Sequence, residues 1–416
     1  MPRHLVLALT SLLVLAACGG GGGGYGSGGG GGGGPGPNVT TLTVEEFQPG
    51  FVNMPYVSVT VCQTNTANCM TIDHVEVDTG SWGLRILSTP GNAAFLQSLT
   101  QQYVGATTTP VVECAQFADG FSWGPVVFAD VAVSGEKAGN IPIHVIGAPA
   151  PFTNIPSSCS SIGTEEDTVA QFGANGVIGV GVFAQDCGSA CATTVVSGQY
   201  YACPTNGASC NSILEPVDLQ VSNPVASFGP LSAGAPPDND GVLVELPAVA
   251  ADGAITATGS LVFGIGTQSN NGLGTATVFT ADPNSGLITV TFQGTAYPGL
   301  LDTGSNGYFF NDSALTVCSS SSAAPGFFCT PANITANLTG LNGTQDTVNF
   351  ATGDANAMIV ANPANAALPQ LAGPSVNIPN QPPIFSLGLP FFYGRNVFIA
   401  IEGANAGGTT GPYFAF

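Results

Sequence analysis

Short apolar runs, many of them β-branched, alternate with turn residues along most of the chain after residue 50. In the segment 56–61, apolar and polar side chains alternate with the period of two that a half-buried strand requires. Helical periodicity is scarce, and 93–103 is one candidate helix. We therefore predict an all-β fold. Further strands are predicted at 126–133, 141–146, 177–182, 242–246, 260–264, 276–279 and 287–292.

The composition indicates a folded protein rather than a disordered acidic chain. Of the 416 residues, 44% are apolar and only 7% are charged, which leaves room for two or three domains with buried cores. The formal net charge of −21 arises because lysine and arginine together number only four. Such a surface repels phosphate backbones, so we expect no nucleic-acid partner. Cationic partners and acidic surroundings remain compatible with this charge.

Residues 1–18 have the organisation of an export signal. A short basic start is followed by the apolar stretch 5–14, and Leu15-Ala16-Ala17 then precede Cys18. Small residues before a cysteine at this distance resemble the lipobox of bacterial lipoproteins. The resemblance implies cleavage before Cys18 and attachment of lipid to that cysteine. The alternative is a secretory signal with an unrelated cysteine, and the apolar stretch is too short for a confident membrane span.

The segment that follows is expected to act as a tether. Residues 19–38 are nearly all glycine as far as residue 36, a composition typical of a flexible linker. Gly19, directly after the cysteine, is not the aspartate associated with retention in the inner membrane. The resemblance therefore implies a lipid-anchored protein of the bacterial cell envelope, sorted to the outer membrane.

The number of cysteines agrees with export. Eleven cysteines without Cys18 leave ten, an even number that suits five disulfides in an oxidising compartment. The rival is a zinc site, but no C-x-x-C spacing and no nearby histidine supports it, so we predict no metal. Proximity suggests the pairs Cys62–Cys69, Cys114–Cys159 and Cys318–Cys329, whereas Cys187, Cys191, Cys203 and Cys210 could pair either nested or adjacent.

The tetrapeptide Asp-Thr-Gly-Ser occurs twice, at 78–81 and at 302–305, each time after an apolar approach. A strand that leads into a tight glycine turn can hold one carboxylate rigidly, and two such strands can bring two carboxylates together. The alternative is that each copy is simply a turn, because Asp and Gly favour turns. Duplication favours two related β lobes, at 39–235 and 236–416.

The chain resembles the pepsin-like aspartic protease family at further places. The apolar-Gly segments 176–181 and 385–388 look like the strands that cross beside the family's two catalytic turns. The segment 389–398 resembles its closing segment, with a last strand at 412–416. The resemblance implies two pseudo-symmetric β lobes with a central cleft, the pepsin-like acid protease fold, and it leaves the insertion 187–210 unmatched.

The resemblance also implies a role for each residue of the two tetrapeptides. Asp78 and Asp302 would be the catalytic pair, which shares one proton and activates a water without any cofactor. The serines would orient the carboxylates, the threonines would tie the two turns together, and the glycines would permit close backbone approach. These supporting residues are Thr79, Gly80 and Ser81 in the first copy and Thr303, Gly304 and Ser305 in the second.

One part of the chain departs from the family pattern. The hairpin 113–124 matches the mobile flap over the cleft, but Phe117 falls near the position of the family's flap tyrosine. Arg85 stands where the family has the tryptophan that bonds this tyrosine. Two alternatives follow for Arg85, namely a pair with Asp119 at the cleft entrance or two separately solvated charges. The predicted flap and cleft residues are Phe117, Asp119, Gly120, Trp123 and Arg85.

These observations lead to two functional hypotheses. The first is a membrane-tethered aspartic endopeptidase that hydrolyses an extended polypeptide and acts as a monomer. The second is a catalytically inactive homologue that binds peptides or glycans or serves as a scaffold lipoprotein of the cell envelope. The intact tetrapeptides favour the first hypothesis, and the altered flap favours the second.

Overall fold

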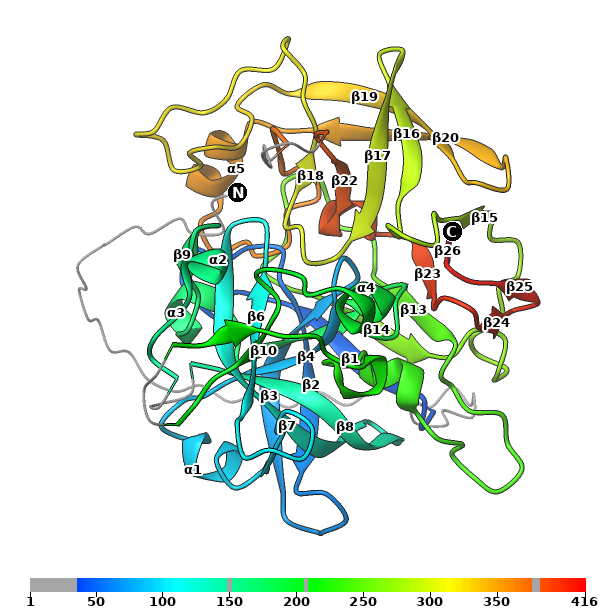
Figure 1. The fold of residues 1–416 in the computed structure, drawn as a ribbon. Coiled ribbons are helices and arrows are strands. Elements are labelled where there is room, and N and C mark those ends of the chain that lie inside the picture. Colours follow the sequence, from blue (N-terminus) through cyan, green and yellow to red (C-terminus); the bar gives the residue numbers. More distant parts are fainter. Residues whose placement is uncertain (1–35, 148–151, 206–208, 376–381) are drawn as a thin grey trace, which may run out of the picture.

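A computed structural model describes residues 36–147, 152–205, 209–375 and 382–416 (Figure 1). In these residues strands dominate, and the longest helix, α5 (Ala355–Ala361), has seven residues. The prediction of a mostly β fold is confirmed. The predicted signal segment, Cys18 and residues 19–35 of the predicted tether lie outside the described residues. No helix within the described ranges is both long and apolar enough to cross a membrane.

The first half of the chain is built mainly of antiparallel strands. The predicted strand at 56–61 is confirmed as part of β2, and a disulfide joins β2 to β3 at Cys62 and Cys69. The elements of this half are β1 (Val39–Val44), β2 (Pro55–Cys62), β3 (Cys69–Asp78), β4 (Trp82–Leu87), α1 (Ala93–Leu96), β5 (Thr100–Gln101), β6 (Val111–Gln116), β7 (Gly120–Val133), β8 (Glu136–Ile146), α2 (Ser157–Ser160), β9 (Thr164–Glu165), α3 (Val169–Phe172), β10 (Gly176–Val180), α4 (Gly188–Thr193), β11 (Tyr200–Ala202), β12 (Asn211–Ser212), η1 (Val217–Leu219) and η2 (Pro224–Ser227).

The second half is also formed by short strands. Every strand predicted there overlaps an observed one, with shifts of up to three residues at the ends. Its elements, besides α5, are β13 (Gly241–Glu245), β14 (Ala257–Phe263), β15 (Val278–Thr280), β16 (Ile288–Phe292), β17 (Thr295–Asp302), β18 (Tyr308–Phe309), β19 (Ala332–Thr339), β20 (Gln345–Thr352), β21 (Ala372–Gly373), β22 (Phe385–Gly388), η3 (Leu389–Phe391), β23 (Asn396–Ala400), β24 (Asn405–Ala406), β25 (Thr409–Thr410) and β26 (Tyr413–Ala415).

The predicted helix at 93–103 is wrong for most of its length. Only one helical turn, α1, forms there, and the chain continues into β5. Thr100 and Gln101 pair with Phe128 and Val127 of β7, so sheet pairing outweighs the local helical pattern.

The two halves of the chain share a sheet. Strand β1, from the first half, pairs over its whole length with β14, and β14 continues through β13 to β23 and β26. In Figure 1 these strands lie between β2, β3, β7 and β8 of the same sheet at the bottom and β16, β17, β19 and β20 of a second sheet at the top. A division of the chain at residues 235 and 236 therefore cuts across hydrogen-bonded strands.

Both tetrapeptides lie beside a crossing strand, as predicted. In the first half, β10 runs parallel to β3 and places Gly179 opposite Asp78. In the second half, β22 runs parallel to β17 and places Gly388 opposite Asp302. Each crossing strand also pairs antiparallel with the strand after the tetrapeptide, β4 or β18. The same local topology thus occurs twice.

Five disulfides are formed among the described cysteines. The three predicted pairs are confirmed. The four remaining cysteines pair adjacently, as Cys187–Cys191 and Cys203–Cys210, which decides between the two arrangements left open by the sequence. Each of these two bridges closes a short local loop in the insertion 187–210.

Candidate active site

Each of the two aspartates is fixed by its own turn. Asp78 ends β3, where its Oδ1 accepts a hydrogen bond from the Gly80 amide at 2.8 Å and its Oδ2 accepts one from the Ser81 hydroxyl at 2.5 Å. Asp302 ends β17 and repeats both bonds, from the Gly304 amide at 2.9 Å and from the Ser305 hydroxyl at 2.6 Å. Because each carboxylate oxygen has a donor, the orientation of both carboxyl groups is set before any substrate binds.

The threonines join the two turns reciprocally. The Thr79 amide donates to the Thr303 hydroxyl at 3.1 Å, and the Thr303 amide donates to the Thr79 hydroxyl at 3.0 Å. Each hydroxyl then donates across to the other half, to the carbonyl of Leu301 at 2.9 Å or of Val77 at 2.6 Å. Both threonines are buried, so these four bonds lock the turns at one separation.

The glycines let the two turns approach closely. A Cβ added to Gly80 would lie 2.5 Å from the carboxyl carbon of Asp302, and a Cβ added to Gly304 would lie 2.6 Å from Oδ1 of Asp78. Each carboxyl group therefore faces the backbone of the opposite turn. The structure brings together all eight residues of the two tetrapeptides, which lie in distant parts of the chain.

The pair of carboxyl groups favours a single shared proton. Burial, together with the neighbouring Asp78 carboxylate and the hydrogen bond between the two groups, raises the pKa of Asp302 to about 8. Below that pH, Asp302 holds a proton, because two ionised carboxylates in contact repel each other. The site therefore offers one proton acceptor and one proton donor side by side.

The predicted flap covers this pair. A cavity of about 200 Å³ lies between the two turns and the hairpin tip 116–119 that joins β6 to β7. Phe117 and Asp119 line the cavity, as predicted, and Phe117 packs edge-on against Phe172 with ring centroids 5.9 Å apart. An apolar ring thus stands where the resemblance had placed a hydroxyl.

Residues 34–416 match the family described as "Protein of unknown function (DUF3443)". The chain belongs to this family. No curated protein matches it. Among solved structures it is similar to the aspartic proteinase from Irpex lacteus, with 15% sequence identity and a TM-score of 0.49, over 91% of this chain and 96% of that one.

Two predicted cleft residues of this DUF3443 chain lie away from the cavity. Trp123 is buried, its indole Nε1 donates to the Phe152 carbonyl at 2.7 Å, and its ring packs on Tyr201. Gly120 pairs with Thr164 of β9. Both residues belong to the β6–β7 hairpin predicted as the flap, but neither lines the cavity over the two aspartates.

Arg85 is not at the cleft entrance either, so both alternatives for it, a pair with Asp119 and a solvated charge, are wrong. It is buried, and its Nη2 donates to Glu113 Oε1 at 2.5 Å and to Asp186 Oδ2 at 3.2 Å. Its Nη1 donates to the Trp82 carbonyl at 3.0 Å. A buried cation needs buried acidic partners, and this half of the chain supplies them from β6 and from the segment after β10.

The acids around Arg85 form a network that the sequence analysis missed. Glu113 also contacts His144 Nδ1 at 2.8 Å, and the Tyr200 hydroxyl donates to Asp186 Oδ1 at 2.6 Å. Although burial opposes ionisation, Arg85 and His144 hold the pKa of Glu113 well below its usual range. Burial and then Glu113 raise the pKa of Asp186 well above its usual range. The network therefore places one buried guanidinium between two buried carboxyl groups.

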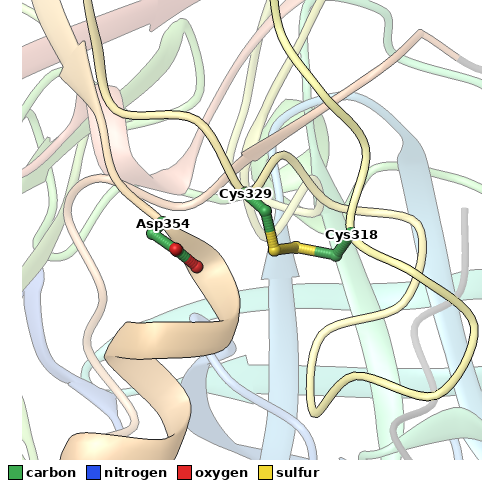
Figure 2. Close-up of side chains that lie close together, drawn as sticks. All are labelled: Cys318, Cys329 and Asp354. Atoms are coloured by element: carbon green, nitrogen blue, oxygen red, sulfur yellow. A yellow bond between two sulfur atoms is a disulfide. The ribbon is translucent and has the colours of Figure 1, made fainter.

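A third group of polar side chains lies at the start of α5. Cys318, Cys329 and Asp354 are the one set of three His, Cys, Asp or Glu side chains in the described residues with ligand atoms close enough for a metal ion (Figure 2). The two sulfur atoms are bonded to each other, so they offer no thiolate. Asp354 instead caps the helix, because its side chain accepts a hydrogen bond from the Ala357 amide at 2.9 Å.

Proposed function

We propose that this protein is an aspartic endopeptidase that hydrolyses peptide bonds with a water activated by Asp78 and Asp302. The observation that carries the proposal is the reciprocal geometry of the two Asp-Thr-Gly-Ser turns, in which each carboxyl group faces the opposite turn. This arrangement supports a bilobal, pseudo-symmetric fold of the pepsin type with the cleft between the lobes.

The chemistry uses the single proton of the pair. The ionised Asp78 removes a proton from water as the water oxygen attacks the carbonyl carbon of the scissile bond, and Asp302 gives its proton to the carbonyl oxygen. The resulting tetrahedral diol collapses when Asp78 passes its proton to the amide nitrogen, the C–N bond breaks, and one diol hydroxyl returns a proton to Asp302. The products are a carboxylic acid and an amine, and no covalent enzyme intermediate forms.

The cavity under the flap supports an extended polypeptide as the substrate. Its lining combines Leu300 and Phe117 with the polar groups of the two turns and with Gln116. An extended chain offers its scissile carbonyl to the carboxyl pair, while backbone groups of the hairpin tip lie above it.

We also propose how the protein is anchored. Residues 1–18 act as a lipoprotein signal, Cys18 carries lipid, and residues 19–38 tether a monomeric protease domain to the outer membrane of a bacterial cell envelope. The lipobox and the glycine-rich composition support this. Labelling of the expressed protein with a palmitate analogue tests it, because label should appear on the wild type and be absent from Cys18→Ala.

The catalytic proposal is tested by mass spectrometry of a peptide library incubated with the domain from residue 36 onward. We expect cleavage by the wild type in mildly acidic buffer and none by Asp78→Asn or Asp302→Asn. Activity should fall as the pH rises through about 8, because Asp302 then loses its proton. Cleavage that survives either substitution would refute the mechanism.

A second candidate is a catalytically inactive homologue that binds peptides or glycans. The observation that favours it is Phe117, which places an apolar ring rather than a hydroxyl over the carboxyl pair. Binding of library peptides without any cleavage by the wild type would select this candidate.

A further inference from the structure

A second and larger cavity lies one residue away from the catalytic turn. Its volume is about 420 Å³, against about 200 Å³ for the cavity over the two aspartates. Ser81 lines the smaller cavity and Trp82 lines the larger one. The two cavities therefore border consecutive residues of the chain, the last of the tetrapeptide and the first of β4.

The aromatic edge of this cavity is tied to the catalytic turn. Trp82 packs edge-on against Phe183, with ring centroids 4.7 Å apart. Phe183 follows the crossing strand β10, and the amide of Gly181 in the same segment donates to the Ser81 carbonyl at 2.9 Å. The position of the aromatic pair relative to Asp78 is therefore fixed by backbone bonds.

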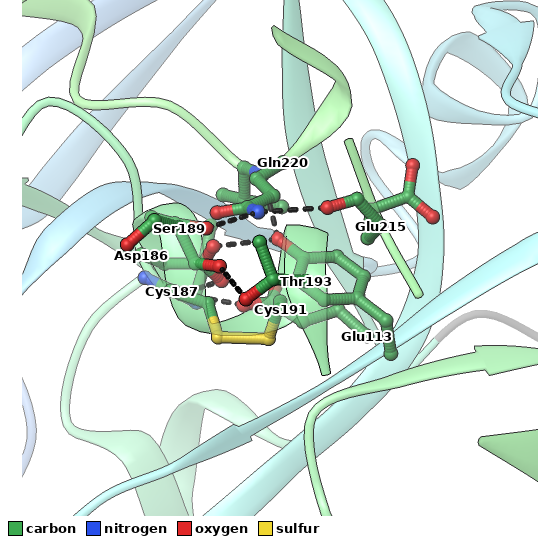
Figure 3. Close-up of a disulfide and its surroundings, with 12 residues drawn as sticks. Glu113, Asp186, Cys187, Ser189, Cys191, Thr193, Glu215 and Gln220 are labelled. Atoms are coloured by element: carbon green, nitrogen blue, oxygen red, sulfur yellow. Dashed lines mark hydrogen bonds and ion pairs between the residues drawn. A yellow bond between two sulfur atoms is a disulfide. The ribbon is translucent and has the colours of Figure 1, made fainter. Parts of the chain in front are cut away.

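The insertion that lies outside the pepsin-like resemblance builds one wall. Cys187, Gly188, Ser189 and Ala190 line the cavity, and the Cys187–Cys191 disulfide closes this short segment (Figure 3). The Gln220 side chain donates to the Gly188 carbonyl at 2.8 Å. These constraints make the wall rigid, so the cavity is formed before a ligand binds.

The charged side chains of the lining are both acidic. The carboxyl group of Asp186 accepts hydrogen bonds from Arg85 Nη2 at 3.2 Å and from the Tyr200 hydroxyl at 2.6 Å. Glu402, which comes from the second half of the chain, is exposed, and its Oε1 accepts a long bond from the Ala184 amide at 3.3 Å. Among the residues that the structure describes, no lysine or arginine lines the cavity. A cavity whose lining holds both an aromatic ring and an exposed carboxylate is suited to a cation.

We propose that this cavity binds an arginine or lysine side chain of the substrate peptide, with the cation over Trp82 and near Glu402. The inference rests on the proposed function, because the peptide must lie across the carboxyl pair to reach both places. It adds a substrate class, namely peptides with a basic residue near the cleaved bond. The net charge of −21 favours the approach of such peptides.

Trp82 itself provides the readout. The chain has two tryptophans, and Trp123 is buried, so a bound peptide reaches only Trp82. The probe is a set of neutral hexapeptides in which one arginine, or its uncharged isostere citrulline, is moved from position to position. Binding is measured by tryptophan fluorescence with the cleavage-impaired Asp302→Asn protein from residue 36 onward.

At the best position we expect the arginine peptide to bind about fivefold to tenfold more tightly than the citrulline peptide. Glu402→Gln should reduce this ratio to about twofold or less. The matched control is Glu46→Gln, because Glu46 is also exposed and also accepts a backbone bond, from the Gly50 amide at 2.8 Å. That variant should keep the full ratio.

Equal affinities for the two peptides at every position, an unchanged ratio in Glu402→Gln, or no fluorescence response at all would each overturn the inference. Its failure is distinguishable from failure of the proposed function. Cleavage by the wild type without any preference for arginine would show that this cavity does not bind substrate, and the protease function would still hold. A charge-dependent fluorescence response without cleavage would support binding of the basic side chain in this cavity and would reject the protease function.

Discussion

Removal of one hydroxyl group between the two turns should destabilise the whole protein. The hydroxyl of Thr303 accepts a bond from the Thr79 amide at 3.1 Å and donates one to the Val77 carbonyl at 2.6 Å. Thr303→Val keeps the shape of the side chain but leaves both buried backbone groups without a partner. At about 1–3 kcal/mol for each group, we expect a loss of about 2–6 kcal/mol in the free energy of unfolding.

Urea denaturation of the domain from residue 36 onward measures this loss. The matched control is Thr303→Ser, which keeps the hydroxyl and should cost only about 1 kcal/mol for the lost methyl group. Thr79→Val should behave like Thr303→Val because the bonds are reciprocal, and the double variant should show a coupling of at least about 0.5 kcal/mol. Equal stabilities of Thr303→Val and Thr303→Ser, or strictly additive single effects, would refute the reasoning.

Three further predictions concern buried charge and close approach. Arg85→Met should destabilise the fold by about 3–5 kcal/mol in urea because it leaves buried acids unpaired, whereas Lys137→Met, at an exposed cation, should change stability by less than about 0.5 kcal/mol. Burial raises the pKa of Glu136 to about 8, so its stabilising contribution is complete below the unfolded value of about 4.5 and is lost as the pH rises through 8. The melting temperature should therefore fall more steeply between pH 5 and pH 9 in the wild type than in Glu136→Gln, and parallel curves would contradict this. Gly80→Ala should abolish peptide cleavage, because its Cβ would meet the opposite carboxyl group, and an active variant would show that the turns are further apart.

Features encoded by short stretches of sequence could be predicted. The two tetrapeptides, the strands that lead into them and the crossing strands each consist of consecutive residues with a recognisable pattern. Disulfides between cysteines that are close in sequence, such as Cys62–Cys69, could also be predicted because the short loop keeps the two cysteines near each other. The joining of the two turns could be inferred because the motif occurs twice.

Features that depend on distant partners could not be predicted. Arg85 was expected at the surface of the cleft, but its acidic partners come from β6 and from the segment after β10, and nothing near Arg85 in the sequence indicates them. Trp123 belongs to the predicted flap by position, yet strand pairing turns it into the interior. The shared sheet that joins β1 to β14 has no local signal in the sequence either.

The central claim is that Asp78 and Asp302 act together on one water. The most direct measurement is a crystal structure of the domain with a peptide mimic that carries a hydroxyl group in place of the scissile carbonyl. The account predicts that the hydroxyl oxygen lies between the two carboxyl groups, within about 2.6–3.2 Å of an oxygen of each. A hydroxyl bound to only one carboxyl group, or a mimic bound outside the cavity under the flap, would contradict it.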